Sequence, residues 1–468
     1  MELKLKFLGV LWGILMVSQD LNTYYLYILL LVTSPNTISC NNFLDYYTLF
    51  VFINTIASGI FYPISGWITD ISANKSALVF LVANIIQLVF ISLQILPYCF
   101  SELFVDISWF NNKGWIILCV FWQVTQLVSI QNVNSLWKLI KQITEKERNT
   151  DNNKNNLQLV NSIGNIGDLT SDITETLTLS ILAIVILFVK SDMINYKFIL
   201  IYIFIAITLL NLILCVTSIY LFTSNKNENV NEFNIRKDTK KPKILPHKWL
   251  YSSIKNFYKQ KIAYHAFWHC ILLGIYATIV QYPLSLIEVS IINVSNNLCN
   301  GVLTNLLLLG ATTNLCYLIG SISYRLFVVN ASPIRFYRWY YPIGALSLLG
   351  ITTALWFKMY YIITLILISF ATMIPYYLTY YDYFLFTEQS QGKSYGFVLG
   401  LYGTINTIIT ASIQSLYYIG ISFGLILGFS IVLLVLSIIY SYYLAYAVNK
   451  KQMEEVHIAE PLISVNYQ

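Results

Sequence analysis

Apolar residues occur in long blocks along the chain, and short polar stretches separate these blocks. A helix that crosses a hydrocarbon core about 30 Å thick needs roughly 20 apolar residues. Blocks of that length recur from one end of the chain to the other, so the pattern predicts an all-α membrane protein with twelve transmembrane helices. The predicted spans are residues 7–32, 45–65, 76–97, 114–138, 157–189, 196–222, 262–289, 301–325, 334–357, 360–386, 394–419 and 423–447.

The basic residues are distributed unevenly between the two sides that these spans define. With twelve spans both termini lie on one side, and that side receives all but four of the 28 Lys and Arg residues. The exceptions are Lys113, Lys190, Lys197 and Lys358. Because Lys and Arg are enriched in cytoplasmic loops, we expect both termini in the cytosol. The pattern leaves open whether the membrane is the plasma membrane or that of an organelle.

The longest polar segment divides the predicted spans into six and six, and it contains ten Lys and Arg residues. It is either a solvated connection that fixes the topology or a segment that binds anionic lipid. Inside it, Trp249, Leu250, Tyr251, Ile254 and Phe257 have helical spacing among lysines, which predicts a short helix on the membrane surface. We therefore expect a six-helix half at 1–222, a basic cytosolic linker at 223–261, a second six-helix half at 262–447 and a cytosolic tail at 448–468.

Composition supports a membrane protein and argues against several functions. The chain is 57% hydrophobic and 11% charged, with a mean hydropathy of +0.64, whereas soluble domains carry about 25% charged residues. We find no glycine-rich phosphate loop and no large cytosolic domain, so we expect no enzyme, no ATP-driven pump and no cofactor. The basic residues lie between spans, so the expected partners are the bilayer and a small solute rather than nucleic acid, with the chain monomeric. Cys40, Cys99 and Cys299 fall in or beside non-cytosolic loops, which leaves one disulfide among them open.

Polar residues inside predicted spans are informative because each must face protein or water rather than lipid. The fifth span carries Asp168, Asp172 and Glu175 at positions i, i+4 and i+7, which places three carboxyl groups on one helical stripe. Asn161 lies two turns earlier on about the same side. Three neighbouring carboxyl groups cannot all ionise at low cost, so the stripe suits proton coupling or cation binding. Alternatively these acids lie in a wide cytosolic opening, because the apolar part of the span begins only at Leu177.

Three other spans contain polar residues of interest. Asp20 lies in the middle of the first span, and Asp382 lies in the tenth, where neighbouring tyrosines could satisfy it. His265 and His269 in the seventh span are four residues apart, a spacing that can chelate a metal ion, although histidine near the interface is also common. Proline removes a backbone donor, so Gln281-Tyr282-Pro283 predicts a break in this helix, where carriers bind solutes and ions.

Aromatic residues cluster at two span ends, at Tyr337–Tyr341 and Tyr376–Tyr383. Such clusters are typical of the interfacial belts in which aromatic rings lie at headgroup level. The clusters therefore fit interfacial belts and need no role in substrate binding.

The segment between the second and third spans reads Gly66-Trp67-Ile68-Thr69-Asp70-Ile71-Ser72-Ala73-Asn74-Lys75. It resembles the cytosolic loop motif of the major facilitator superfamily, in which an acid follows a glycine by four residues and a base comes next. The resemblance implies two six-helix halves. It also implies that Gly66 permits a close approach of helices and that Asp70 holds one conformation by pairing with a neighbouring helix, so these two are the expected gating residues.

Within this superfamily the chain resembles the ferroportin family of iron exporters. The similar patches are Trp12-Gly13, Ser65–Gln94, Leu157–Thr176 with Asn161 and Asp168, and the set Asp382, Glu388, Gly396 and Gly400. At the first metal site, the family has an aspartate directly after Trp-Gly and a histidine four residues later, whereas this chain has Ile14 and Ser18. The second site uses a cysteine in a broken seventh helix and a histidine in the eleventh, and near those positions this chain has Gln281 and, within a residue, Ile413 or Gln414.

The leading hypothesis is therefore a ferroportin-like secondary transporter that exports iron or a similar divalent cation by alternating access. The expected substrate-binding residues are Asp20, Asn161, Asp168, Gln281 and Asp382, and Asp20 and His269 are candidate metal ligands. The alternative is a major facilitator carrier for an amino acid, nucleoside or sugar, which the non-chelating residues at the family's metal positions favour. A third hypothesis, a receptor or scaffold that transports nothing, predicts that Asp20 and Asp382 lie inside packed protein.

Overall fold

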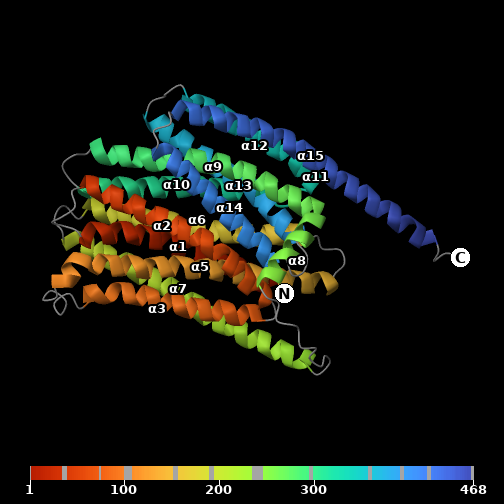
Figure 1. The fold of residues 1–468 in the computed structure, drawn as a ribbon, viewed down its shortest axis with the longest axis horizontal. Helices are drawn as coiled ribbons and strands as arrows, with labels where there is room; N and C mark the ends of the chain where they lie inside the picture. Colours follow the sequence, from red (N-terminus) through yellow and green to blue (C-terminus); the bar gives the residue numbers. More distant parts are fainter. Residues whose placement is uncertain are drawn as a thin grey trace.

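The computed structural model of the chain describes residues 2–33, 40–72, 75–99, 108–150, 156–188, 194–233, 246–294, 299–356, 361–389, 395–418 and 423–464. These residues form a bundle of long helices (Figure 1). In chain order they are α1 (Glu2–Thr33), α2 (Cys40–Ile71), α3 (Ser76–Cys99), α5 (Ser108–Thr150), α6 (Asn156–Phe188), α7 (Ile194–Phe233), α8 (Pro246–Lys259), α9 (Lys261–Val294), α10 (Cys299–Phe327), α11 (Pro333–Arg335), the π-helical η2 (Phe336–Tyr340), α12 (Tyr341–Trp356), α13 (Tyr361–Gln389), α14 (Tyr395–Tyr418) and α15 (Phe423–Ser464).

Every range predicted to span the membrane overlaps helix in the described part of the chain. Among the described residues, five helices are long and apolar enough to cross a membrane by length and composition. These five segments are Ser76–Gln94, Ile201–Thr223, Lys261–Ile279, Tyr395–Ile413 and Gly428–Lys451. The multi-pass character of the chain is thus supported, while the full count of twelve spans remains a prediction.

Two of the predicted helices differ from what the sequence indicates. The expected break at Gln281-Tyr282-Pro283 is wrong for the backbone, because α9 continues as one helix through this segment. Proline also lies inside α2 at Pro63 and inside α13 at Pro375, and neighbouring helices in a membrane bundle let such helices continue. The ninth predicted span is not uniform either, since α11 and η2 precede α12. A π-helical turn changes which side chains face inward beyond it.

Helices from the two halves of the chain meet along two long contacts. The α2 helix packs along α14, and α6 packs along α10, while α1 lies against α6 within the first half. In Figure 1, α1, α2, α6 and α14 lie in the middle of the bundle, with α3 and α7 near one edge and α12 and α15 at the opposite edge. The segments from before and after the linker therefore form one bundle with an interface between them.

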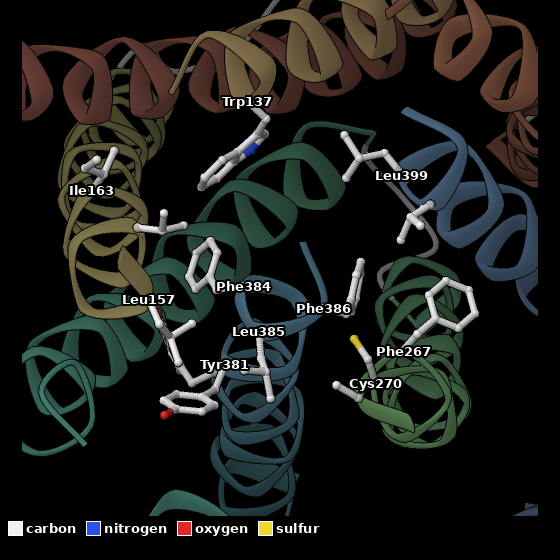
Figure 2. Close-up of a cluster of buried hydrophobic side chains, with 14 of the residues drawn as sticks. Trp137, Leu157, Ile163, Phe267, Cys270, Tyr381, Phe384, Leu385, Phe386 and Leu399 are labelled. Atoms are coloured by element: carbon white, nitrogen blue, oxygen red, sulfur yellow. The ribbon is translucent and has the colours of Figure 1, made fainter. Parts of the chain in front are cut away.

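Helix α13 lies between two other helices in the buried core. Figure 2 shows Leu157 and Ile163 of α6 on one side of it, and Phe267 and Cys270 of α9 on the other. All four side chains are at most 4% exposed. Any displacement of α13 would therefore disturb the packing of both α6 and α9, because a close-packed core transmits strain.

The outer surface of the bundle is rich in exposed aliphatic side chains. On α7 they recur at Leu209, Leu212, Val216 and Ile219, each at least 48% exposed. Soluble monomers rarely expose apolar surface on this scale. The distribution fits helices that present these faces to lipid.

The linker contains the short helix that the sequence predicts. Along α8, Trp249 and Phe257 are buried, whereas Tyr251, Ile254 and Tyr258 are at least half exposed. The buried side packs on the second half of the chain, with the Trp249 ring 5.8 Å from Phe397 between centroids. The amphipathic helix is confirmed, and its position on a membrane surface remains a prediction.

Candidate functional site

Helix α6 carries a stripe of buried polar residues toward the interface between the two halves of the chain. Asn161, Asn165, Asp168, Asp172 and Glu175 recur at intervals of three or four residues and are all at most 8% exposed. This spacing places them on one face of a helix. That face meets α1 and α10, so the stripe is enclosed by helices from both halves.

The Asp20 carboxyl group of α1 lies within hydrogen-bonding reach of the Glu175 carboxyl group. Ser171 also donates a hydrogen bond to Glu175 over 2.9 Å. Two ionised carboxylates in contact repel each other, so such a pair is stable when it shares a proton or binds a cation. Asp20 is partly exposed, whereas Glu175 is buried.

The two other acids of the stripe contact groups in the second half of the chain. Asp172 accepts a hydrogen bond from Ser321 of α10 over 2.5 Å and a longer one, 3.3 Å, from the Tyr377 hydroxyl of α13. Asp168 lies within hydrogen-bonding reach of the Tyr380 hydroxyl of α13 and the Trp12 indole of α1. These contacts consist of hydroxyl and indole donors, none of which neutralises a carboxylate charge. We refer to Asp20, Asp168, Asp172 and Glu175 as the interface acids.

The amide group of Asn161 is wholly buried and meets no hydrogen-bond partner among the described residues. One turn along, Asn165 donates to the Ser321 backbone carbonyl over 2.9 Å, while its own side-chain oxygen has no partner there. Unsatisfied buried amides are costly. A polar solute that entered beside the stripe could satisfy both.

A second polar cluster lies in the second half of the chain, between α9, α13, η2 and α15. His269 Nδ1 lies 2.7 Å from Asp382 Oδ2, and His269 Nε2 lies 3.1 Å from the Ser437 carbonyl oxygen. The Tyr337 hydroxyl donates to Asp382 Oδ1 over 2.5 Å. His269 and Asp382, which we call the His–Asp pair, are both 0% exposed. Both ring nitrogens are engaged, so in this conformation neither is free to bind a metal ion.

A third arrangement joins the ends of α2 and α14. A Cβ atom added to Gly66 would overlap the Gly396 carbonyl oxygen and lie 2.9 Å from its carbon, so the two backbones touch at this point. Four residues on, Asp70 accepts hydrogen bonds from the amides of Gly396 at 2.7 Å and Phe397 at 3.1 Å and from the Trp249 indole at 3.0 Å. These amides belong to the first turn of α14, whose N–H groups lack partners within the helix. We call this set the Asp70 latch.

Asp70 lies beyond the predicted span 45–65, in the predicted cytosolic loop. Burial raises the pKa of its carboxyl group to about 6, while the hydrogen bond from Gly396, the charge of Lys138 and the hydrogen bonds from Trp249 and Phe397 act in the opposite direction. Nearby, Lys141 of α5 donates to the Thr387 carbonyl oxygen of α13 over 2.9 Å. The two halves are thus joined at the end of the bundle that the charge pattern assigns to the cytosol.

The structure separates the residues that the sequence groups into one site. Asp20, Asn161 and Asp168 lie along the α6 interface, whereas Asp382 and His269 form their own cluster. The side chain of Gln281 lies outside the described residues, as do those of Cys40, Cys99 and Cys299. Among the described residues, no three His, Cys, Asp or Glu side chains come close enough together to hold a metal ion.

The sequence does not predict the role of several tyrosines in these clusters. Tyr337, Tyr341 and Tyr381 are each 0% exposed, so the expectation of an interfacial belt is wrong for them. Tyr337 binds Asp382, and Tyr377 binds Asp172. Aromatic residues at a span end do not reveal by sequence whether they face headgroups or the bundle interior. An acid in the same or a neighbouring span is the signal that could have distinguished the two.

Comparison with known proteins gives a likeness of structure only. No protein-family model matches the chain, and no curated protein matches it. A solved structure of a bacterial homologue of the iron transporter ferroportin in an outward-facing state aligns with 94% of this chain and 99% of its own, at a TM-score of 0.55 and 14% identity. The inward-open xylose transporter XylE from E. coli aligns with 94% of this chain and 96% of its own, at 0.56 and 12% identity.

The chain has the major facilitator fold. A proton:xylose symporter, XylE bound to 6-bromo-6-deoxy-D-glucose, aligns at a TM-score of 0.58 with 11% identity, over 94% of this chain and 95% of its own. The iron-transporter homologue and the sugar symporter are thus equally similar in fold. The contacts of α2 with α14 and of α6 with α10 join the parts of the chain before and after α8, so the interface acids lie where these two parts meet.

Proposed function

We propose that the protein is a secondary transporter that moves a divalent cation, such as iron(II), across a membrane by alternating access. The interface acids carry this proposal. Four carboxyl groups lie along this interface, two of them, Asp20 and Glu175, in contact with each other, and their other partners are hydroxyls and an indole. A site with this excess of negative charge attracts cations, and carboxylate oxygens are ligands for divalent metals.

In the proposed cycle the Asp20–Glu175 pair exchanges its shared proton for the cation. The two carboxyl side chains come from different helices, α1 and α6. The shared proton connects these helices when no cation is bound, and a bound cation would connect them in its place. Asp168 contacts α13, and Asp172 contacts α10 and α13. The change in charge of the Asp20–Glu175 pair would alter these contacts. Opening of the Asp70 latch would then expose the site to the opposite side.

The direct test is metal flux into proteoliposomes that contain the full-length protein, with Co²⁺ and Fe²⁺ as probes. Glu175→Gln keeps an acceptor for Ser171 but removes the charge, and Asp20→Asn does the same on α1. Each should reduce flux by about 10-fold or more, the scale on which changes at and around metal ligands act. Asp238→Asn in the basic linker removes one carboxylate outside the proposed site and should leave flux unchanged. Wild-type protein that moves neither metal, or variants that move both normally, would contradict the proposal.

A second candidate function is transport of an organic solute such as a sugar, amino acid or nucleoside. The unpartnered amide of Asn161 and the unpartnered side-chain oxygen of Asn165 favour it, because amides bind hydroxyl and amine groups well. A thermal-shift screen of the purified protein against metals and metabolites separates the two. Stabilisation by a metabolite, lost in Asn161→Leu, with no response to Co²⁺ or Fe²⁺, would select the organic solute.

The receptor or scaffold hypothesis predicts that Asp20 and Asp382 lie inside packed protein, and this holds for one of the two. Asp382 lies inside packed protein, as that hypothesis predicts, and its contacts are all satisfied. Asp20 does not fit, because it is partly exposed and lies against a second carboxyl group. In a scaffold such a pair of carboxyl groups would lower the stability of the fold unless a cation or proton binds there.

A further inference from the structure

The hydrogen bonds of the His–Asp pair determine how many protons it holds. The Ser437 carbonyl oxygen can only accept a hydrogen bond, so the contact at 3.1 Å requires that His269 Nε2 carries a proton. The contact at 2.7 Å between His269 Nδ1 and Asp382 Oδ2 then needs a proton of its own. That proton resides on the imidazole, giving an ion pair, or on the carboxyl group, giving a neutral pair. In either case the pair binds one more proton than a neutral histidine beside an ionised aspartate would.

We propose that His269 and Asp382 form a proton-binding site, and that loading and unloading of this proton accompanies the movement of the second half of the chain. The site is distinct from the interface acids. It takes a proton rather than a metal ion, because both ring nitrogens and both carboxyl oxygens already have partners.

The surroundings isolate this proton. His269 is eight residues into α9 and Asp382 is seven residues before the end of α13, which places both roughly 12 Å from the same end of the bundle. Among the described residues, the titratable groups that interact with the pair are Cys270 of α9, Tyr324 of α10, Tyr381 of α13, Tyr337 of η2, Tyr341 of α12 and Tyr440 of α15. None of these groups is basic, and tyrosine hydroxyls stay protonated near neutral pH. The shared proton therefore determines the net charge of the cluster.

A purely structural role does not require a carboxyl group at this position. An asparagine would donate from its amide to Nδ1 and accept from Tyr337, so every hydrogen bond of the cluster would remain. Only the capacity to bind and release a proton would be lost. Release would leave a buried carboxylate beside a neutral imidazole, which is costly, so release requires a conformation in which α9 and α13 admit water.

Helix α13 connects this proton to the interface acids. It directs Asp382 toward α9, while Tyr377 and Tyr380 reach Asp172 and Asp168 on α6. A shift of α13 on proton release would move both hydroxyls relative to those acids. This coupling, unlike the proton-binding site itself, rests on the function proposed above.

The proton is tested first without any transported solute. The chain has four histidines, so histidine-¹⁵N NMR of the full-length protein in nanodiscs gives few signals, and His269→Gln assigns one of them. In the wild type we expect the His269 Nδ1 signal to change with pH between its proton-bound and proton-free states. In Asp382→Asn it should stay in the neutral state at every pH. A signal that is insensitive to pH in both proteins, or that titrates identically in both, overturns the proposal.

The coupling is tested with Co²⁺ in proteoliposomes. Asp382→Asn should lower net uptake driven by a pH gradient by about tenfold, within the 5–150-fold range of common coupling energies, while exchange of internal for external Co²⁺ continues. His457→Gln is the matched control, in the last part of α15 and in the predicted cytosolic tail, and should affect neither. Equal loss of uptake and exchange in Asp382→Asn would show a structural role and refute the coupling. If wild-type protein moves no Co²⁺, the cation proposal fails, and the NMR result still decides the proton site.

Discussion

Gly66 is the position at which one added methyl group should shift the balance between the closed and open arrangements of the Asp70 latch. In Gly66→Ala the new Cβ would overlap the Gly396 carbonyl oxygen and approach its carbon to 2.9 Å. Both are backbone atoms of α14, so they cannot rotate away as a flexible side chain could. Overpacking of this kind costs about 1–3 kcal/mol. The closed arrangement of the latch should therefore lose about 5–150-fold in population relative to the open one.

Hydrogen exchange measures this shift directly, because the amides of Gly396 and Phe397 are bonded to Asp70 in the closed latch. We expect the peptide spanning 395–400 to exchange faster in Gly66→Ala by that factor, and peptides of α3 to be unaffected. Gly350→Ala is the matched control, since a Cβ there meets nothing within 4 Å, and alanine favours a helix over glycine. Unchanged exchange at 395–400 in Gly66→Ala would refute the close contact of α2 with α14.

Three further outcomes are expected. The pKa of Asp70 is raised to about 6 in the closed latch, so the closed state binds a proton more tightly than an open state with exposed Asp70. By linkage, lowering the pH through about 6 should stabilise closure and, after correction for intrinsic rates, slow exchange at 395–400, and Asp70→Asn should remove this dependence. Trp249→Phe keeps the packing on α14 but removes a hydrogen bond to a charged group, so it should speed exchange there by about 10-fold or more. Phe336→Ala removes a ring stacked 3.8 Å from Tyr381 and should destabilise the detergent-solubilised protein by about 3–5 kcal/mol, as a drop in melting temperature will show.

The periodic features of the chain are predictable, because they depend on local spacing alone. The helices coincide with apolar blocks, the α8 amphipathic pattern is visible in the linker, and the stripe of acids on α6 follows from a spacing of three and four. The partners of those acids are not predictable in this way. Asp20 meets Glu175 only because α1 and α6 pack in one register, and no local pattern encodes the relative height of two helices whose contacting residues are 155 positions apart. The helix break at Pro283 fails for a related reason, since the energetic effect of a proline depends on the helices around it.

The Asp70 latch combines contributions that favour its closed arrangement with one that opposes it. Backbone contact between Gly66 and Gly396, together with the capped amides of α14, favours closure. Burial of the Asp70 carboxylate opposes it, as the raised pKa shows, because a group that paired with its surroundings at no net cost would keep its ordinary value. A latch that combined the close backbone contact with a fully compensated charge would hold one state too firmly for alternating access. Two states that interconvert must lie within a few kcal/mol of each other, and in the proposed transport cycle the partial cancellation at Asp70 would keep the closed state within that range.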